Sequence, residues 1–147
     1  MSASPRTKPV PEPSEISLPF WEAARRGELR IQRCDDCGQR WWIPKAACPR
    51  CLSEAYRWER VSGRGTLYSW SAVHRPADPE AFGDEIPYLV AIVRLEEGPH
   101  MLTRMTACEP EDLVKDMPVE VVFEQASDEI TLYKFRPAPG AGGGDPA

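Results

Sequence analysis

The sequence predicts a mainly β protein: a short N-terminal helix, a cysteine-rich metal-binding unit, and a five-stranded barrel with one short helix. Two observations lead to this fold class. Two Cys-x-x-Cys pairs stand close together between residues 34 and 51. After them come short apolar or alternating runs ordered as three strands, a short helix and two strands, which is the order of an OB-type barrel.

The N-terminal unit begins with a predicted helix over residues 18–26, with Ser17 as its candidate cap and Gly27 as its stop. Residues 28–33 then alternate polar and apolar side chains, as a half-buried strand does. Residues 40–43 are expected to pair with that strand across the turn that holds the first cysteine pair. These residues are therefore predicted to form a helix and a small hairpin unit.

The barrel strands show the period of two that a sheet requires, and closure of the barrel would remove exposed strand edges. In the first strand we expect Leu67 and Val73 on one face and Tyr68 and Trp70 on the other. The second strand is apolar on both faces, which predicts burial on both sides. The strands are predicted over 66–73, 88–95, 101–107, 119–125 and 130–135, and the short helix over 109–116.

Composition divides the chain into four segments. The 16 prolines are concentrated toward the ends, and the C-terminal end also contains a triple glycine. Such segments have too few apolar residues to fold. We therefore predict disordered tails at 1–16 and 138–147, the helix and zinc ribbon at 17–61, and the OB-fold barrel at 62–137.

The strongest chemical signal is the set Cys34, Cys37, Cys48 and Cys51. Two residues between thiolates let one tight turn present both sulfurs to one ion, and two such turns form a zinc ribbon. Four thiolates fill a tetrahedral ion and leave no position for substrate, which predicts a structural Zn²⁺ site.

Three other interpretations of these cysteines stay open at this point. Rubredoxin-like iron binding fits the knuckle sequences, although the segment between the pairs is short for it. A thioredoxin-like redox pair would need one pair and a βαβ context. Four unrelated free thiols are the remaining alternative.

Composition also limits the function classes. The formal net charge of −5 opposes nucleic-acid binding, which needs a basic surface. No run approaches the roughly 18 apolar residues of a membrane span, and the N-terminal residues lack the apolar core of a secretory signal. We expect a cytoplasmic protein, where reducing conditions favour metal sites over disulfides.

No catalytic constellation stands out. Cys108 is expected to be a small buried residue with no base beside it, and His74 and His100 lie in no recognisable catalytic pattern. Cofactor-binding residues other than metal ligands cannot be assigned from these patterns. Trp41, Trp42 and Trp58 flank the metal unit; we expect them to form its small core and to contact the barrel or helix, with some share in partner binding.

Several segments together resemble a known family. They are PFWEAARRGEL at 19–29, RCDDCG at 33–38, CPRC at 48–51, a W-x-x-x-S-G-x-G-T-L-Y-S stretch at 58–69, PYLVAIVRLEEG at 87–98 and MPVEVVFE at 117–124. This resembles the bacterial and archaeal acyl-CoA-associated OB-fold proteins with a rubredoxin-like zinc ribbon, over roughly residues 17–137. The departures are Leu52 after the second cysteine pair and Met117 where glycine is common.

The resemblance implies a non-catalytic accessory subunit of a thiolase-fold enzyme, either a sterol-carrier-type thiolase or an aldolase. Such enzymes act on acyl-CoA substrates in steroid, aromatic or fatty acid metabolism, and some members pair with hydratase-like subunits. The four cysteines carry over as zinc ligands. The competing hypotheses are a single-stranded nucleic-acid-binding zinc ribbon/OB protein, and an enzyme that uses Cys108 or His74 itself.

Overall fold

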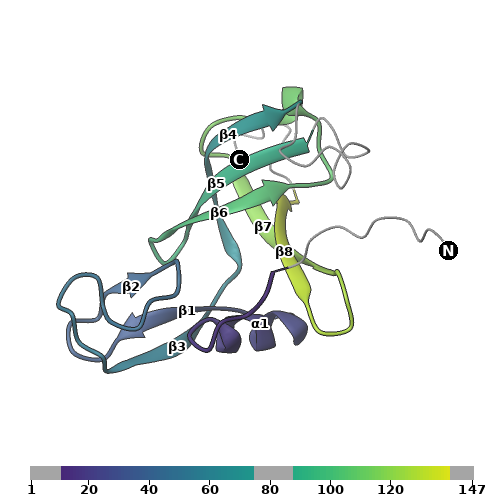
Figure 1. Cartoon of the computed structure of the whole chain (residues 1–147). Coiled ribbons are helices and arrows are strands. Elements are labelled where there is room, and N and C mark those ends of the chain that lie inside the picture. The colour runs from purple at the N-terminus through teal and green to yellow at the C-terminus, as the bar shows by residue number, and fades with distance from the viewer. Residues whose placement is uncertain (1–10, 75–87, 140–147) are drawn as a thin grey trace, which may run out of the picture.

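The computed structural model describes residues 11–74 and 88–139, and the predicted tails lie mostly outside these ranges. Two layers are visible in Figure 1, with a barrel above a small sheet and a helix. None of the helices in the described ranges is long and apolar enough to cross a membrane. The elements in chain order are α1 (Leu18–Arg25), β1 (Leu29–Cys34), β2 (Arg40–Trp41), β3 (Tyr56–Val61), β4 (Arg64–Val73), β5 (Tyr88–Leu95), β6 (His100–Met105), η2 (Pro110–Asp112), β7 (Pro118–Gln125) and β8 (Thr131–Pro137).

The helix α1 forms where predicted, but its start differs in detail. Ser17 occupies the cap position, yet its side chain makes no capping bond to the helix. Instead the Ser14 backbone N–H donates to the Ser17 hydroxyl at 2.9 Å, and the Ser17 N–H donates to the Ser14 hydroxyl at 3.1 Å. The two serines therefore close a turn that precedes the helix.

The lower sheet has three antiparallel strands in the order β2–β1–β3. The strand β3 was not predicted, and its Val61 faces Leu29 of β1 across the register. The Glu59 carboxylate joins all three strands, because it accepts from Arg33 of β1 at 2.9 Å and from Arg40 of β2 at 2.6 Å. The Arg40 bond is the first cause of the lowered pKa of Glu59, so this pairing stays ionised at neutral pH.

The upper layer is a closed five-stranded barrel in the order β4–β5–β6–β8–β7, which confirms the predicted OB-type fold. The close approach of β4 to β5 needs Gly65, because a Cβ there would collide with the Arg94 carbonyl oxygen and the Val93 side chain. The predicted helix over 109–116 shortens to the single turn η2. Its capping box uses Glu109 and Asp112, and the chain then extends at Leu113, which turns into the core with 7% exposure.

Two further expectations for the barrel are corrected. A bulge between Leu67 and Ser69 shifts the register of β4, so that Trp70 faces the buried Ala91 while Leu67 faces Val93. Directly paired residues share a face, so Trp70 lies on the Leu67 side and Tyr68 points outward. The strand β5 buries alternate residues from Leu89 to Leu95 rather than all of them.

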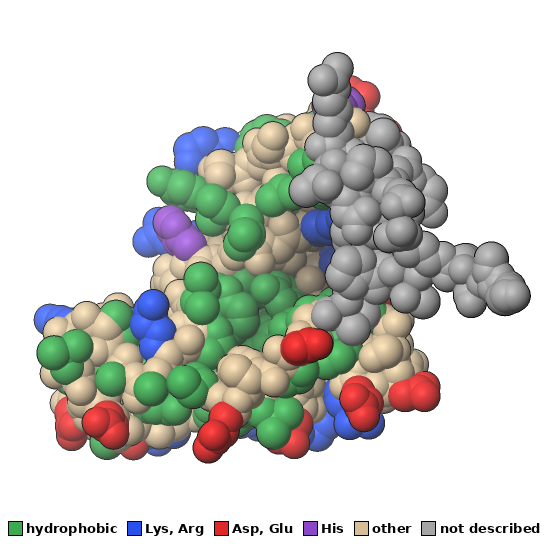
Figure 2. Space-filling view, viewed as in Figure 1, with side chains coloured by type: hydrophobic (Ala, Val, Ile, Leu, Met, Phe, Trp, Pro, Cys, Tyr) green, Lys and Arg blue, Asp and Glu red, His purple; other side chains and the backbone are tan. Residues whose placement is uncertain are grey.

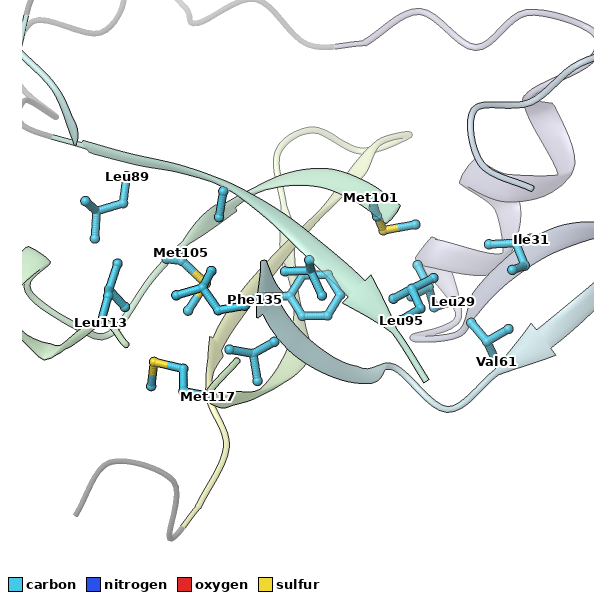
Figure 3. Close-up of a cluster of buried hydrophobic side chains, with 14 of the residues drawn as sticks. Leu29, Ile31, Val61, Leu89, Leu95, Met101, Met105, Leu113, Met117 and Phe135 are labelled. Carbon is cyan, nitrogen blue, oxygen red and sulfur yellow. The ribbon is translucent and has the colours of Figure 1, made fainter. Parts of the chain in front are cut away.

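One apolar core runs through both layers. Figure 3 shows Phe135, Met101 and Met105 within the barrel, and Leu29, Ile31 and Val61 of the lower sheet next to Leu95. Phe20 of α1 joins the same cluster at 1% exposure. A second cluster, within the ribbon, consists of Cys34, Trp41 and Cys48 with Tyr56 beside them. The ribbon end therefore has its own small core.

Candidate metal centre

The first knuckle is a tight turn around Cys34. Its Sγ accepts backbone N–H groups from Asp36 at 3.3 Å and Cys37 at 3.4 Å. The Gly38 N–H donates to the Cys34 carbonyl at 3.1 Å, and Gly38 has a φ of +78°. The N–H dipoles of Asp36 and Cys37 point at the Cys34 sulfur and favour its thiolate form.

The second knuckle repeats this backbone around Cys48. Its Sγ accepts N–H groups from Arg50 at 3.3 Å and Cys51 at 3.5 Å, and the Leu52 N–H donates to the Cys48 carbonyl at 2.9 Å. Leu52 takes a φ of +67° at the position equivalent to Gly38. The two turns are therefore alike in geometry although their sequences differ.

The strand β1 and the loop before β3 bring the two knuckles face to face. The Sγ atoms of Cys34 and Cys51 lie 3.6 Å apart, as do those of Cys37 and Cys48, and all four lie within 4.8 Å of one another. These separations far exceed a disulfide bond. Tetrahedral zinc with bonds of about 2.3 Å places its sulfurs about 3.8 Å apart. The cage therefore fits one tetrahedral ion.

Electrostatics also favour a bound cation. The pKa of Cys34 falls to about 7, chiefly because the Cys37 N–H donates to its sulfur. The pKa of Cys51 rises to about 12: the Ser53 N–H lowers it, but the neighbouring Cys34 sulfur and burial outweigh that effect. Four thiolates this close repel one another, and a divalent cation is the group that lets all of them lose their protons.

A buried amide, which no sequence pattern indicated, holds the loop between the knuckles. Gln32 in β1 is 1% exposed. Its Nε2 donates to the Lys45 carbonyl at 2.7 Å, while its Oε1 accepts the Lys45 N–H at 2.9 Å. Both polar atoms of Gln32 are thus satisfied by one backbone residue, which fixes the loop against β1.

The three tryptophans flanking the metal unit divide between the two cores. Trp41 is 4% exposed and packs with Cys34, Cys48 and Tyr56, its ring 5.8 Å from the tyrosine ring. Trp42 and Trp58 instead pack against the main core. The prediction of a small ribbon core is correct for Trp41, and the expected contact with the barrel and helix is made by Trp42, through Tyr133 and Phe20.

Trp42 takes part in an aromatic cluster between the layers. Its ring centroid lies 4.4 Å from Phe20 and 5.9 Å from Tyr133 of β8. The Tyr133 hydroxyl donates to the Leu102 carbonyl at 3.2 Å, and burial raises the pKa of Tyr133 to about 12. Figure 2 shows hydrophobic side chains lining a hollow between the barrel and the lower layer.

The other candidate residues are not brought together. Burial, and then the charges of Asp112 and Glu109, raise the pKa of Cys108, which is opposite to what a nucleophilic thiol needs. His74 follows the end of β4 and is exposed. His100 begins β6, where its ring lies 4.6 Å from Tyr68.

Comparison with known families accounts for both layers. Residues 21–57 match the family described as "ChsH2, rubredoxin-like zinc ribbon domain", and residues 58–124 match "ChsH2, C-terminal OB-fold domain". The chain belongs to the ChsH2 family. The boundary between the two matches lies within β3, between Arg57 and Trp58, whereas the predicted domain limits at 61 and 62 lie at the end of that strand and stay a prediction.

Relatives of this ChsH2-family protein differ in length. A "DUF35 domain-containing scaffold protein" of Methanocaldococcus jannaschii is 36% identical over 71% of this chain and 78% of its own length. A "Probable enoyl-CoA hydratase alpha subunit" of Thermomonospora curvata is 40% identical over 81% of this chain, but the chain spans only 37% of that protein. A solved structure titled "Ltp2-ChsH2(DUF35) aldolase" contains a chain that is 34% identical, with a TM-score of 0.78, 88% of this chain covered and 99% of that one.

Proposed function

We propose that Cys34, Cys37, Cys48 and Cys51 bind one structural zinc ion. The closed set of four sulfurs supports zinc, and iron is the competing ion for such a set. Elemental analysis of the purified chain should find one zinc per chain; iron in its place, or neither metal, would contradict the proposal. Substitution Cys34→Ala or Cys51→Ala should leave insoluble or partner-free protein, since the ion supplies the folding energy of the ribbon.

We further propose that the chain is a non-catalytic accessory subunit of a thiolase-fold enzyme, such as a thiolase or aldolase, acting on acyl-CoA in steroid, aromatic or fatty acid metabolism. One observation carries this proposal: the similarity to nearly the whole of one chain of the Ltp2-ChsH2(DUF35) aldolase. The hydratase subunit among the relatives supports a second kind of partner for the same complex. We expect the complex in the cytoplasm, where the thiols stay reduced.

Exposed apolar side chains beside the aromatic cluster support a docking role. Ile43, which is 62% exposed, directly follows Trp42, and Leu102, which is 59% exposed, carries the carbonyl that Tyr133 contacts. We call Trp42, Ile43, Leu102 and Tyr133 the apolar platform. Burying an aliphatic side chain of this size contributes about 1.5–3 kcal/mol, and aromatic anchors dominate many interfaces. The platform therefore offers a partner subunit rigid anchors without a nucleophile.

Co-expression with thiolase-fold proteins of the same organism tests the role. The tagged chain should retain its partner through size-exclusion chromatography, and Ile43→Asp and Leu102→Asp should each weaken capture by tenfold or more. Val114→Asp is the matched control, because Val114 is 63% exposed but follows η2, outside the platform. A stable monomer that captures no thiolase-fold protein would count against the proposed function. Equal loss with all three variants would count against the platform.

A further inference from the structure

The two knuckles of the ribbon share a backbone but differ in their side chains. The first reads Cys-Asp-Asp-Cys-Gly over residues 34–38, and the second reads Cys-Pro-Arg-Cys-Leu over residues 48–52. In each knuckle the N–H of the last residue donates to the carbonyl of the first cysteine. One turn therefore carries two acidic side chains, and the other carries a proline, a cation and a leucine. We call Pro49, Arg50 and Leu52, all of which are exposed, the knuckle tip.

The side chain of Leu52 contributes little to the fold. It is 76% exposed, and its backbone has a φ of +67°, where L side chains are strained. Gly38 shows that glycine makes the same turn, with a φ of +78°. Strained backbone positions gather at sites of binding and catalysis. A strained residue that buries so little surface in its own fold therefore points to a contact outside the chain.

The knuckle tip is held on a rigid backbone. The Leu52 N–H donates to the Cys48 carbonyl, and the Cys48 N–H donates to the Ser53 carbonyl, both at 2.9 Å. Gln32 fixes the loop that leads into this knuckle through its two bonds to Lys45. A side chain presented in this way needs little ordering of the backbone when it binds, which lowers the cost of association.

The charge around the knuckle tip indicates the chemistry of a partner. Residues 41–53 contain Lys45 and Arg50 but no aspartate or glutamate. In the part of the chain that the structure describes, neither of these two side chains forms an ion pair, and the Asp36 carboxylate of the first knuckle accepts the Ser53 hydroxyl. An apolar pocket bordered by carboxylates would complement such a surface.

We propose that the knuckle tip inserts Leu52 into an apolar pocket of the thiolase-fold subunit and pairs Arg50 with carboxylates at the rim of that pocket. The proposal rests on the proposed accessory role and adds a second contact to the apolar platform. Both contacts lie on one stretch of chain, because Ile43 of the platform and Leu52 stand at opposite ends of residues 43–52. Figure 2 shows hydrophobic side chains on the surface of the ribbon end, at the lower left.

Surface plasmon resonance of the full-length, zinc-loaded chain on thiolase-fold proteins of the same organism tests the proposal, with urea unfolding of each variant alongside. Leu52→Gly should weaken binding about tenfold or more, because an apolar contact is lost, and should also make the chain more resistant to urea, because strain is removed. A merely structural role cannot weaken binding and raise stability together. Leu52→Met keeps an apolar side chain and should bind within about threefold of the wild-type chain.

Charge reversal tests the other half of the contact. Arg50→Glu should weaken binding about tenfold, and the difference from the wild-type chain should shrink at high salt. The matched controls are Val114→Ala, which trims a 63% exposed side chain outside the ribbon, and Arg25→Glu, which reverses an exposed charge in the last turn of α1. Both controls should bind within about twofold of the wild-type chain.

Three results would overturn the proposal: binding that is unchanged by Leu52→Gly and Arg50→Glu, binding that is weakened only in variants that unfold more easily, or a change in the oligomeric state of the isolated chain with Leu52→Gly. The last result would make a second copy of this chain the occupant. If the wild-type chain binds a thiolase-fold protein and the tip variants have no effect, the accessory role stands and the knuckle tip fails. If the wild-type chain binds none, both fail.

Discussion

Leu52 sits in a backbone conformation that glycine adopts at the equivalent place in the other knuckle. Its φ of +67° matches the +78° of Gly38, and its side chain is 76% exposed. A non-glycine residue in this region stores about 1–3 kcal/mol of strain. The strain persists because the Leu52 N–H bond to Cys48 holds the turn.

Single substitutions at Leu52 and Gly38 test for this strain. Leu52→Gly should raise the free energy of unfolding of the zinc-loaded chain by about 0.5–1 kcal/mol, because little buried surface is lost while strain is removed. Gly38→Ala should lower it by about 1 kcal/mol, although a Cβ there meets nothing within 4 Å. Urea unfolding measures both, and equal destabilisation by the two substitutions would contradict this account.

Zinc affinity should depend on pH, because the thiols must lose their protons to bind the ion. The folded chain lowers the pKa of Cys34 from 9.0 to about 7, so Cys34 is mainly thiolate in the fold only above pH 7 and loses the thiolate as pH falls through 7. Zinc must also displace protons from the thiols of higher pKa, such as Cys51. The apparent Kd for zinc should therefore rise by more than about tenfold for each pH unit below 7. Competition with a chromophoric chelator at pH 6, 7 and 8 measures this, and a flat profile would rule it out.

At the scale of elements, Gln32 is the residue through which β1 holds the loop between the knuckles. Gln32→Ala would leave the N–H and carbonyl of Lys45 without their partners in a partly buried place. We expect the free energy of unfolding to fall by about 1–3 kcal/mol, with a matching loss of zinc affinity.

Gln125→Ala serves as the control for Gln32, because Gln125 lies at the exposed end of β7 and its side-chain amide donates to the Ser127 carbonyl of the adjoining turn. Its effect on denaturant unfolding should stay within about 0.5 kcal/mol. Comparable losses for the two glutamine substitutions would show that the buried amide has no special part in the ribbon.

The elements that the sequence-based predictions missed or misplaced share a cause. The strand β3 reads as Tyr-Arg-Trp-Glu-Arg-Val, a run in which half of the residues are charged, and its Glu59 meets Arg33 and Arg40 only when three strands align. The bulge in β4 changes no residue type, so a simple alternation put Trp70 on the wrong face. The helix over 109–116 ended after one turn because burial of Leu113 required extended backbone there.

For the whole molecule, two separate cores predict two separate responses to metal loss. Trp41 packs with Cys34 and Cys48, whereas Phe20 and the barrel strands share the main core. Removing zinc should loosen the ribbon cluster and leave the barrel folded, because only the smaller core depends on the ion.

Treatment with a strong chelator tests this division. Tryptophan fluorescence should shift to longer wavelength as Trp41 gains access to water, while most of the far-ultraviolet circular dichroism of the strands is retained. Restoring zinc should reverse the shift. Collapse of the whole strand signal would show that the cage supports the entire chain rather than its ribbon end.

The sequence by itself determined the four-sulfur set, the order of the barrel strands and the family resemblance, because these depend on local spacing and on a period of two along the chain. Only the tertiary structure decided which side chains contact one another. The Gln32–Lys45 bonds, the apolar platform and the inward position of Trp70 each depend on contacts between residues that are not neighbours in the chain. Their contacts follow from barrel closure, from strand register and from one bulge, and none of these leaves a mark in residue type or spacing.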